Sequence, residues 1–138
     1  MIYYIVTVMA SVYTSIKSRD VFLKQILLQN PGFIVIKFGA QWCGPCEKIK
    51  DYLENKKNTL GRTVHYYDLD VDDNFDVYAF LKKNKMVSGI PVLLAYKLGN
   101  VSFVSDYSVS GTNLKEIDYF FNLVNGVHSG QYSHESNY

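Results

Sequence analysis

The sequence feature that most constrains the fold is a nearly continuous apolar run at residues 33–38, Phe-Ile-Val-Ile-Lys-Phe. Unbroken β-branched and aromatic residues are typical of a strand that is buried on both faces, as in the centre of a parallel sheet. Asn30, Pro31 and Gly32 stand just before the run and end the helical pattern that precedes it. The chain therefore predicts a central strand in a sheet that helices cover on both faces.

Periodic apolar patterns place the other elements around this strand. Strands are expected at 12–16, 63–71 and 91–96, and helices after Ser18, after Cys46, at 75–81 and from Asn113. Gly99 and Asn100 separate the strand at 91–96 from residues 101–104, a hairpin signal that predicts two antiparallel strands. The resulting order, β-α-β-α-β-α-β-β-α, predicts an α/β fold with a mixed sheet.

Length and composition favour one globular domain. The chain has 138 residues, 48% of them hydrophobic, which suits a single core. We expect an N-terminal extension at 1–11, a domain at 12–125 and a polar, mobile tail at 126–138. A net charge of +1 disfavours nucleic acid as a partner. The apolar start is shorter than the ~20 residues that span a bilayer, so we expect no membrane contact and a cytoplasmic location.

The two cysteines, Cys43 and Cys46, are three residues apart and lie between the predicted central strand and a helix. The first sulfur then stands at the helix N-terminus, where free amides and the helix dipole favour negative charge. Such placement lowers a thiol pKa from about 8.5 and creates a nucleophilic thiolate. Cys46 lies one helical turn further along, close enough to form a disulfide reversibly. Cys43 is therefore the candidate attacking group.

Two other interpretations of the cysteine pair stay open from the residues alone: buried structural thiols, or part of a metal site. A structural zinc site usually needs four ligands, and the three histidines, His65, His128 and His134, are scattered along the chain. We therefore expect no metal, and no cofactor besides a redox-active disulfide.

The residues around the pair resemble a known active site. The segment 38–46, Phe-Gly-Ala-Gln-Trp-Cys-Gly-Pro-Cys, resembles the signature of thioredoxins. The segment 87–92 resembles the family segment whose proline is cis and packs against the redox pair, and that proline is Pro91 here. Gly111 lies close to where the family has a glycine beside the substrate groove. The resemblance covers residues 12–124 and implies a thioredoxin fold and dithiol–disulfide exchange.

The resemblance also implies a mechanism and partners. The Cys43 thiolate attacks a disulfide in a client protein, and Cys46 then attacks Cys43 and releases the reduced client. A reductant such as a thioredoxin reductase regenerates the dithiol. The backbone of Ile90 is expected to bind the client like an added strand. The other residues expected at the client groove are Trp42, Gly44, Pro45, Pro91 and Gly111.

The chain departs from the family at a buried acid six residues before the first cysteine, where it has Lys37. The lysine that usually pairs with this acid falls on Asp68, so we expect a charge-swapped pair beneath the cysteines. Asp68 would accept the proton of Cys46, while Lys37 would favour its thiolate. The alternative is that Lys37 extends into solvent.

Three further departures surround the site. Glu47 replaces a common lysine, and at a helix start it complements the dipole. Asp51 replaces the kink proline, which predicts a straighter second helix. Gly39 replaces a common tryptophan and leaves less apolar cover.

Two alternatives to a disulfide reductase stay open. The same scaffold serves as a protein-binding adaptor in relatives that lack the cysteine pair, which this chain retains. The isomerase domains of similar sequence typically have histidine where this chain has Pro45. Both features favour the reductase.

Overall fold

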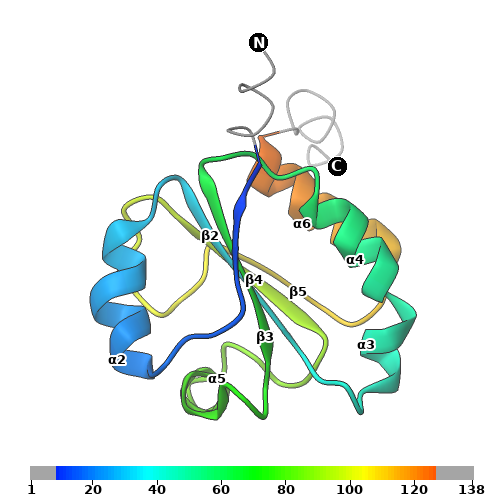
Figure 1. Cartoon of the computed structure of the whole chain (residues 1–138), viewed down its shortest axis with the longest axis horizontal. Helices are drawn as coiled ribbons and strands as arrows, with labels where there is room; N and C mark the ends of the chain where they lie inside the picture. Colours follow the sequence, from blue (N-terminus) through cyan, green and yellow to red (C-terminus); the bar gives the residue numbers. More distant parts are fainter. Residues whose placement is uncertain (1–8, 127–138) are drawn as a thin grey trace, which may run out of the picture.

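The computed structural model describes residues 9–126, in which five strands form one mixed sheet in the order β1-β3-β2-β4-β5. Strands β1 (Ser11–Tyr13), β2 (Phe33–Gly39) and β3 (Val64–Asp70) are parallel. Strand β4 (Val92–Lys97) runs antiparallel to β2 and to β5 (Tyr107–Ser110). Helices pack on both sides of this sheet (Figure 1), so the predicted α/β fold is confirmed.

One face of the sheet is covered by the helical segment that follows β1 and by α5 (Phe75–Lys83). The segment begins as α2 (Arg19–Val21), continues as a π-helical stretch, η1 (Phe22–Ile26), and ends as a 3₁₀ turn, η2 (Leu27–Gln29). The Ser18 hydroxyl accepts the Val21 amide at 3.1 Å and so caps the helix that the sequence predicts after Ser18. Phe22 is fully buried in the core on this face.

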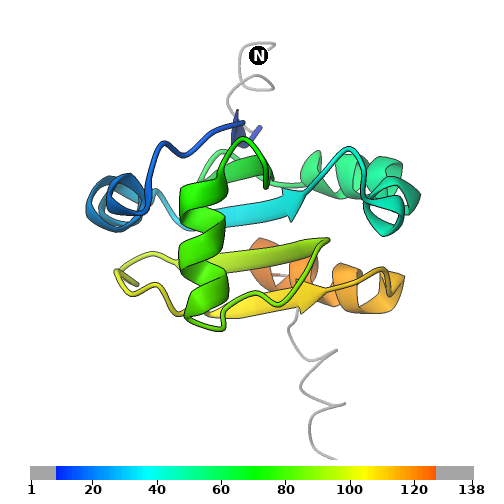
Figure 2. The same cartoon turned by 90° about the horizontal axis from the view of Figure 1, so that it is seen from below.

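The other face carries α3 (Gly44–Lys48), α4 (Lys50–Lys57) and α6 (Leu114–Asn125). Figure 2 shows these helices, coloured teal to orange, grouped on one side of the molecule and α2, in blue, on the opposite side. Ile49, Leu53, Ile117 and Phe120 belong to one cluster of buried apolar residues on this face. This face positions the cysteine pair, because α3 begins directly after Cys43.

The expectation of a straighter second helix is wrong. Helical structure stops at Ile49, where φ is −108° and ψ is 9°, and resumes at Lys50. The Ile49 amide bonds the Cys46 carbonyl at 3.3 Å, as in a tighter turn. We attribute the break to tertiary restraints: the disulfide holds the start of α3, whereas burial of Ile49 and Leu53 fixes the following turn against the sheet.

The last strand lies further along the chain than predicted, at β5 instead of residues 101–104. The Asn100 side chain accepts the Ser102 amide and donates to the Val104 carbonyl, both at 2.9 Å. These bonds hold the backbone in a loop that competes with strand pairing. Pairing starts only where the Asp106 amide donates to the Ala95 carbonyl at 2.8 Å.

Residues 1–8 and 127–138 lie outside the described structure, and with them most of the predicted extension and tail. At the described start, the Ala10 amide donates to the Leu60 carbonyl at 3.2 Å, and Ser11 already belongs to β1. Among residues 9–126, no helix has the length and apolar character needed to cross a membrane.

Candidate active site

The cysteine pair lies at the junction between β2 and α3. Cys43 is the N-cap of α3, and its sulfur accepts the Cys46 amide at 3.2 Å. The two cysteines form a disulfide, with Cα atoms 5.2 Å apart. Pro45 lies in the first turn of α3, where its missing amide proton costs no hydrogen bond. One sulfur therefore stands at the positive end of a helix, and the second is within bonding reach of it.

A second group of residues meets Cys43 from the start of β4. The Cys43 sulfur lies 3.9 Å from the Ile90 carbonyl oxygen, and the Ile90–Pro91 peptide bond is cis. The Pro91 carbonyl accepts the Gly111 amide at 2.9 Å. Gly111 has a φ of +90°, and a Cβ built on it would have no neighbour within 4 Å. Two segments far apart in the sequence thus meet at the Cys43 sulfur, and a third, at Gly111, adjoins them.

Trp42 is 69% exposed, and its indole Nε1 donates to an Asp72 carboxylate oxygen at 2.8 Å. The sequence patterns alone do not indicate this bond. The signal was the topology: β2 and β3 are parallel neighbours, so the segments that follow them meet at one edge. The Val71 amide bonds the Gly39 carbonyl there at 2.9 Å.

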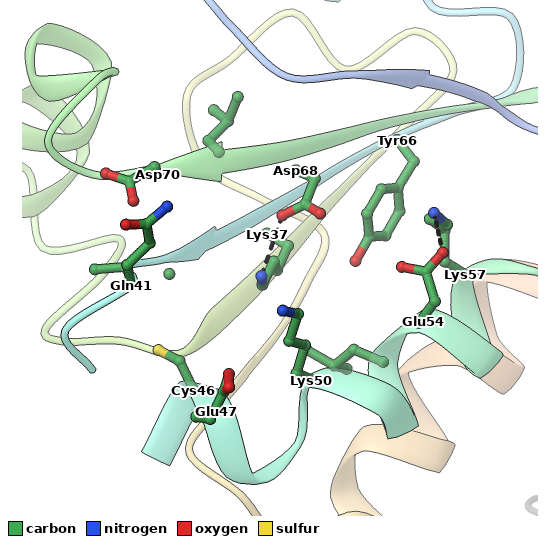
Figure 3. Close-up of a pocket in the computed structure, with 14 residues that line it drawn as sticks. Lys37, Gln41, Cys46, Glu47, Lys50, Glu54, Lys57, Tyr66, Asp68 and Asp70 are labelled. Carbon is green, nitrogen blue, oxygen red and sulfur yellow. Dashed lines mark hydrogen bonds and ion pairs between the residues drawn. The ribbon is translucent and has the colours of Figure 1, made fainter. Parts of the chain in front are cut away.

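A cavity of about 490 Å³ lies on the opposite side of the pair, beneath Cys46. Figure 3 shows it between β2 and β3 on one wall and α3 and α4 on the other. Lys37 and Asp68 face each other in register across the two strands, and the lysine Nζ lies 3.1 Å from a carboxylate oxygen of Asp68. Their side chains are 19% and 40% exposed, respectively. The cavity therefore places an ion pair next to the second cysteine.

Burial shifts the pKa values of two further titratable groups, Tyr66 in the cavity and His65 near the start of β3. Burial raises the pKa of the Tyr66 hydroxyl far above its ordinary value, so this cavity residue is neutral. His65 packs edge-on against the Tyr13 ring, with centroids 5.3 Å apart, and burial lowers its pKa. Within residues 9–126, no cluster of three or more His, Cys, Asp or Glu side chains could hold a metal ion.

Comparison with known sequences agrees with this geometry. The sequence model of the Thioredoxin family matches residues 14–120. The chain is 32% identical over 111 residues to Thioredoxin 3 of Plasmodium falciparum. The aligned region covers 80% of this chain and 58% of that protein. It is 29% identical over 103 residues to thioredoxin of Mus musculus, covering 75% of this chain and 90% of that protein. The chain thus matches just over half of the Plasmodium protein and most of the mouse protein.

Solved structures share the fold. A crystal structure of a Plasmodium falciparum thioredoxin superposes with a TM-score of 0.60 at 30% identity, covering 85% of this chain and 91% of that chain. Thioredoxin from Trypanosoma brucei brucei superposes with a TM-score of 0.61 at 20% identity, covering 83% and 91%, which supports the fold alone. With a family match over most of its length and a cysteine pair at the expected junction, the chain belongs to the thioredoxin family.

Proposed function

We propose that this chain is a thioredoxin-type protein disulfide reductase that works through the Cys43–Cys46 dithiol. The observation that carries the proposal is the position of the Cys43 sulfur, which caps α3 and accepts the Cys46 amide at 3.2 Å. Helix N-termini lower thiol pKa values and so supply the attacking thiolate. Membership of the thioredoxin family supports the same activity.

The proposed reaction transfers two electrons from the dithiol to a client. The Cys43 thiolate attacks one client sulfur, forming a mixed disulfide and expelling the other client sulfur as a thiolate, which takes up a proton. The Cys46 thiolate then attacks the Cys43 sulfur, and the remaining client sulfur leaves and is protonated. The client disulfide is reduced to two thiols, and Cys43 and Cys46 are oxidised to a disulfide.

The client is proposed to bind on the Cys43 side. The Ile90 carbonyl, 3.9 Å from that sulfur, is positioned to accept a backbone hydrogen bond from an extended client segment. Trp42 and Gly111 are exposed, and Gly111 adjoins this position because its amide donates to the Pro91 carbonyl at 2.9 Å. Gly44, Pro45 and the cis Pro91 complete the proposed groove.

Lys37 and Asp68 are proposed to serve the second step. In the mixed disulfide Cys46 must lose its proton, and Asp68, on the wall of the same cavity, accepts it directly or through water. The Lys37 ammonium, 3.1 Å from the Asp68 carboxylate, favours the thiolate that results.

The remaining proposals concern partners and location. Clients are disulfide-containing proteins, and a reductant such as a thioredoxin reductase returns electrons to the site. Residues 12–125 form the catalytic domain. The cytoplasm is the proposed compartment, because its reducing systems keep such a dithiol supplied with electrons.

The test is turnover of insulin, a disulfide-linked protein, with dithiothreitol as reductant. We expect the wild type to accelerate reduction and Cys43→Ser to fall to the rate of dithiothreitol alone. Thermal unfolding of the reduced proteins checks that the variant is folded. Equal rates for folded wild type and variant would overturn the proposal and favour an adaptor on the same scaffold.

A further inference from the structure

Gly39, the last residue of β2, leaves a space beneath Cys46 because it has no side chain. A Cβ built there would lie 3.3 Å from both Cε and Nζ of Lys37 and 3.6 Å from the Cys46 sulfur. Carbon contacts are usually about 3.5–4.0 Å. A side chain at position 39 would therefore displace the end of Lys37, which is flexible enough to move.

We propose that Gly39 is a positioning residue: its missing side chain lets the Lys37 ammonium lie beside the Cys46 sulfur, where this cation stabilises the Cys46 thiolate of the reduced protein. The inference rests on the proposed reductase function and adds a determinant of its redox equilibrium. In Figure 3 the lysine nitrogen lies between the Asp68 carboxylate and the Cys46 side chain.

The other charged groups of the cavity come from three elements. On α4, the Lys57 ammonium pairs with Glu54. Asp70, at the end of β3, accepts the Asp72 amide at 2.8 Å. Glu47 and Lys50 contribute opposite charges from α3 and α4.

Lys37 differs from these groups because its charged atom is among the three atoms nearest to the vacant Cβ position. The Cys46 sulfur is another of those three atoms. The geometry therefore assigns Lys37, rather than the other cavity cations, to this sulfur.

Each sulfur then has its own stabilising group. The Cys43 sulfur has the Cys46 amide at the helix terminus, and the Cys46 sulfur has the Lys37 ammonium. Two neighbouring thiolates repel each other, so the pair ionises in two coupled steps. A cation next to the Cys46 sulfur makes the second of these ionisations more favourable.

This arrangement changes the balance of the redox reaction. Reduction of the disulfide breaks the S–S bond and consumes two electrons, together with one proton for each sulfur that ends as a thiol. Each sulfur that stays a thiolate consumes no proton. Stabilising a thiolate favours the reduced form and makes the couple more oxidising.

The experiment measures the equilibrium constant between the dithiol and glutathione disulfide for wild type, Gly39→Val and Gly39→Ala. At an alkaline pH, where Cys46 is a thiolate in the reduced protein, displacing the ammonium should favour the oxidised protein about tenfold in Gly39→Val, equivalent to about 30 mV, and less in Gly39→Ala. Gly89→Ala is the matched control, because a Cβ built at Gly89 would have no neighbour within 4 Å. Its equilibrium constant should equal that of the wild type.

A double-mutant cycle separates the effect of displacing Lys37 from the effect of a new side chain that packs directly on the Cys46 sulfur. Lys37→Met should shift the equilibrium in the same direction as Gly39→Val, and adding Gly39→Val to Lys37→Met should change nothing further. The inference is overturned if Gly39→Val leaves the equilibrium constant unchanged, or if it acts equally with and without Lys37.

A second readout uses the fact that the chain has two cysteines. In Cys43→Ser, thiolate absorbance reports Cys46 alone, and we expect its titration to rise by about one pH unit when Lys37→Met is added. Neither readout requires a client. If the wild type fails to reduce insulin, the proposed function fails, whereas an unmoved titration defeats only the inference about Gly39 and Lys37.

Discussion

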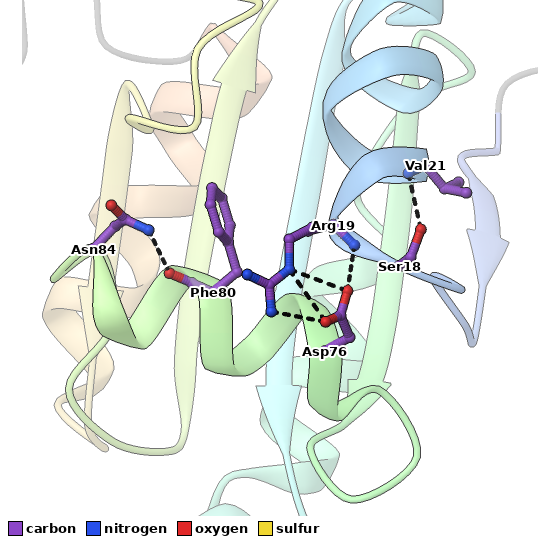
Figure 4. Close-up of polar contacts among 6 residues, drawn as sticks. All are labelled: Ser18, Arg19, Val21, Asp76, Phe80 and Asn84. Atoms are coloured by element: carbon purple, nitrogen blue, oxygen red, sulfur yellow. Dashed lines mark hydrogen bonds and ion pairs between the residues drawn. The ribbon is translucent and has the colours of Figure 1, made fainter.

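Two ion pairs of this protein are similar in composition and different in surroundings. Arg19 holds Asp76 through its backbone amide at 2.8 Å and through two guanidinium nitrogens, and its guanidinium also lies 5.3 Å from the centre of the Phe80 ring (Figure 4). Lys37 holds Asp68 through one contact of 3.1 Å, in a cavity that also contains Cys46. The first pair joins α2 to α5, and the second lies beside a reactive sulfur.

The comparison shows how geometry separates a structural pair from one that can take part in chemistry. A guanidinium bound through several atoms is fixed in one orientation, and its fork matches a carboxylate. An ammonium with one contact is a point charge that can respond when a nearby sulfur becomes charged. We therefore expect substitutions at the first pair to affect stability, and substitutions at the second to affect thiol chemistry.

The largest difference is expected in the rates at which Asp68→Asn and Asp76→Asn release the reduced client. The first removes the proposed proton acceptor and should slow release of the reduced client in single-turnover experiments roughly 10²-fold near neutral pH. The difference in release rate between Asp68→Asn and the wild type should shrink at high pH, where solvent removes the Cys46 proton. Asp76→Asn should release the client at the wild-type rate. Unchanged rates for Asp68→Asn across the pH range would refute the proton role.

The next largest difference is expected in the redox equilibrium constants of Lys37→Met and Arg19→Met, which each remove the cation of one ion pair. Loss of the ammonium should favour the oxidised protein about tenfold in equilibrium with glutathione at an alkaline pH, because the Cys46 thiolate that exists there loses its nearest cation. Arg19→Met should leave that equilibrium unchanged and lower the melting temperature. If both variants shift the equilibrium equally, the distinction between the two pairs is wrong.

The smallest effect is the acid dependence of stability at Asp76. Hydrogen bonds from the Arg19 side chain hold the pKa of this carboxyl below its ordinary value. A carboxyl with a lowered folded pKa stabilises the protein above its unfolded pKa and loses this contribution as the pH falls through the folded pKa. Asp76→Asn should therefore melt below the wild type at neutral pH, and the gap should close as the pH falls below about 4. A gap that stays constant down to strongly acidic pH would show that Asp76 contributes no ionic stabilisation.

The elements that sequence predicted well have local causes. The central strand β2 follows from its apolar run, and the helices predicted after Ser18 and from Asn113 each begin at a side-chain cap. The two errors have different causes, one local and one long-range. The Asn100 side chain binds within its own loop and delays β5. Tertiary packing at Ile49 interrupts the helix predicted after Cys46, although Asp51 stands where the family has its kink proline.

The sequence likewise predicted only part of the candidate site. The cysteine pair and its placement follow from the order of strand, motif and helix, whereas the contact of Lys37 with Asp68 requires the register of two strands. The proposed role of Gly39 depends on the space beside Lys37 and Cys46, which becomes visible only in three dimensions. The bond from Trp42 to Asp72 likewise depends on two segments meeting at one sheet edge.

The most direct test of the account is a trapping experiment with Cys46→Ser. Without the second sulfur, the mixed disulfide cannot resolve, so incubation of the reduced variant with insulin should give a covalent adduct that mass spectrometry locates at Cys43. The double variant Cys43→Ser with Cys46→Ser should give none. Absence of an adduct at Cys43 in the folded Cys46→Ser protein would contradict the claim that this sulfur attacks client disulfides.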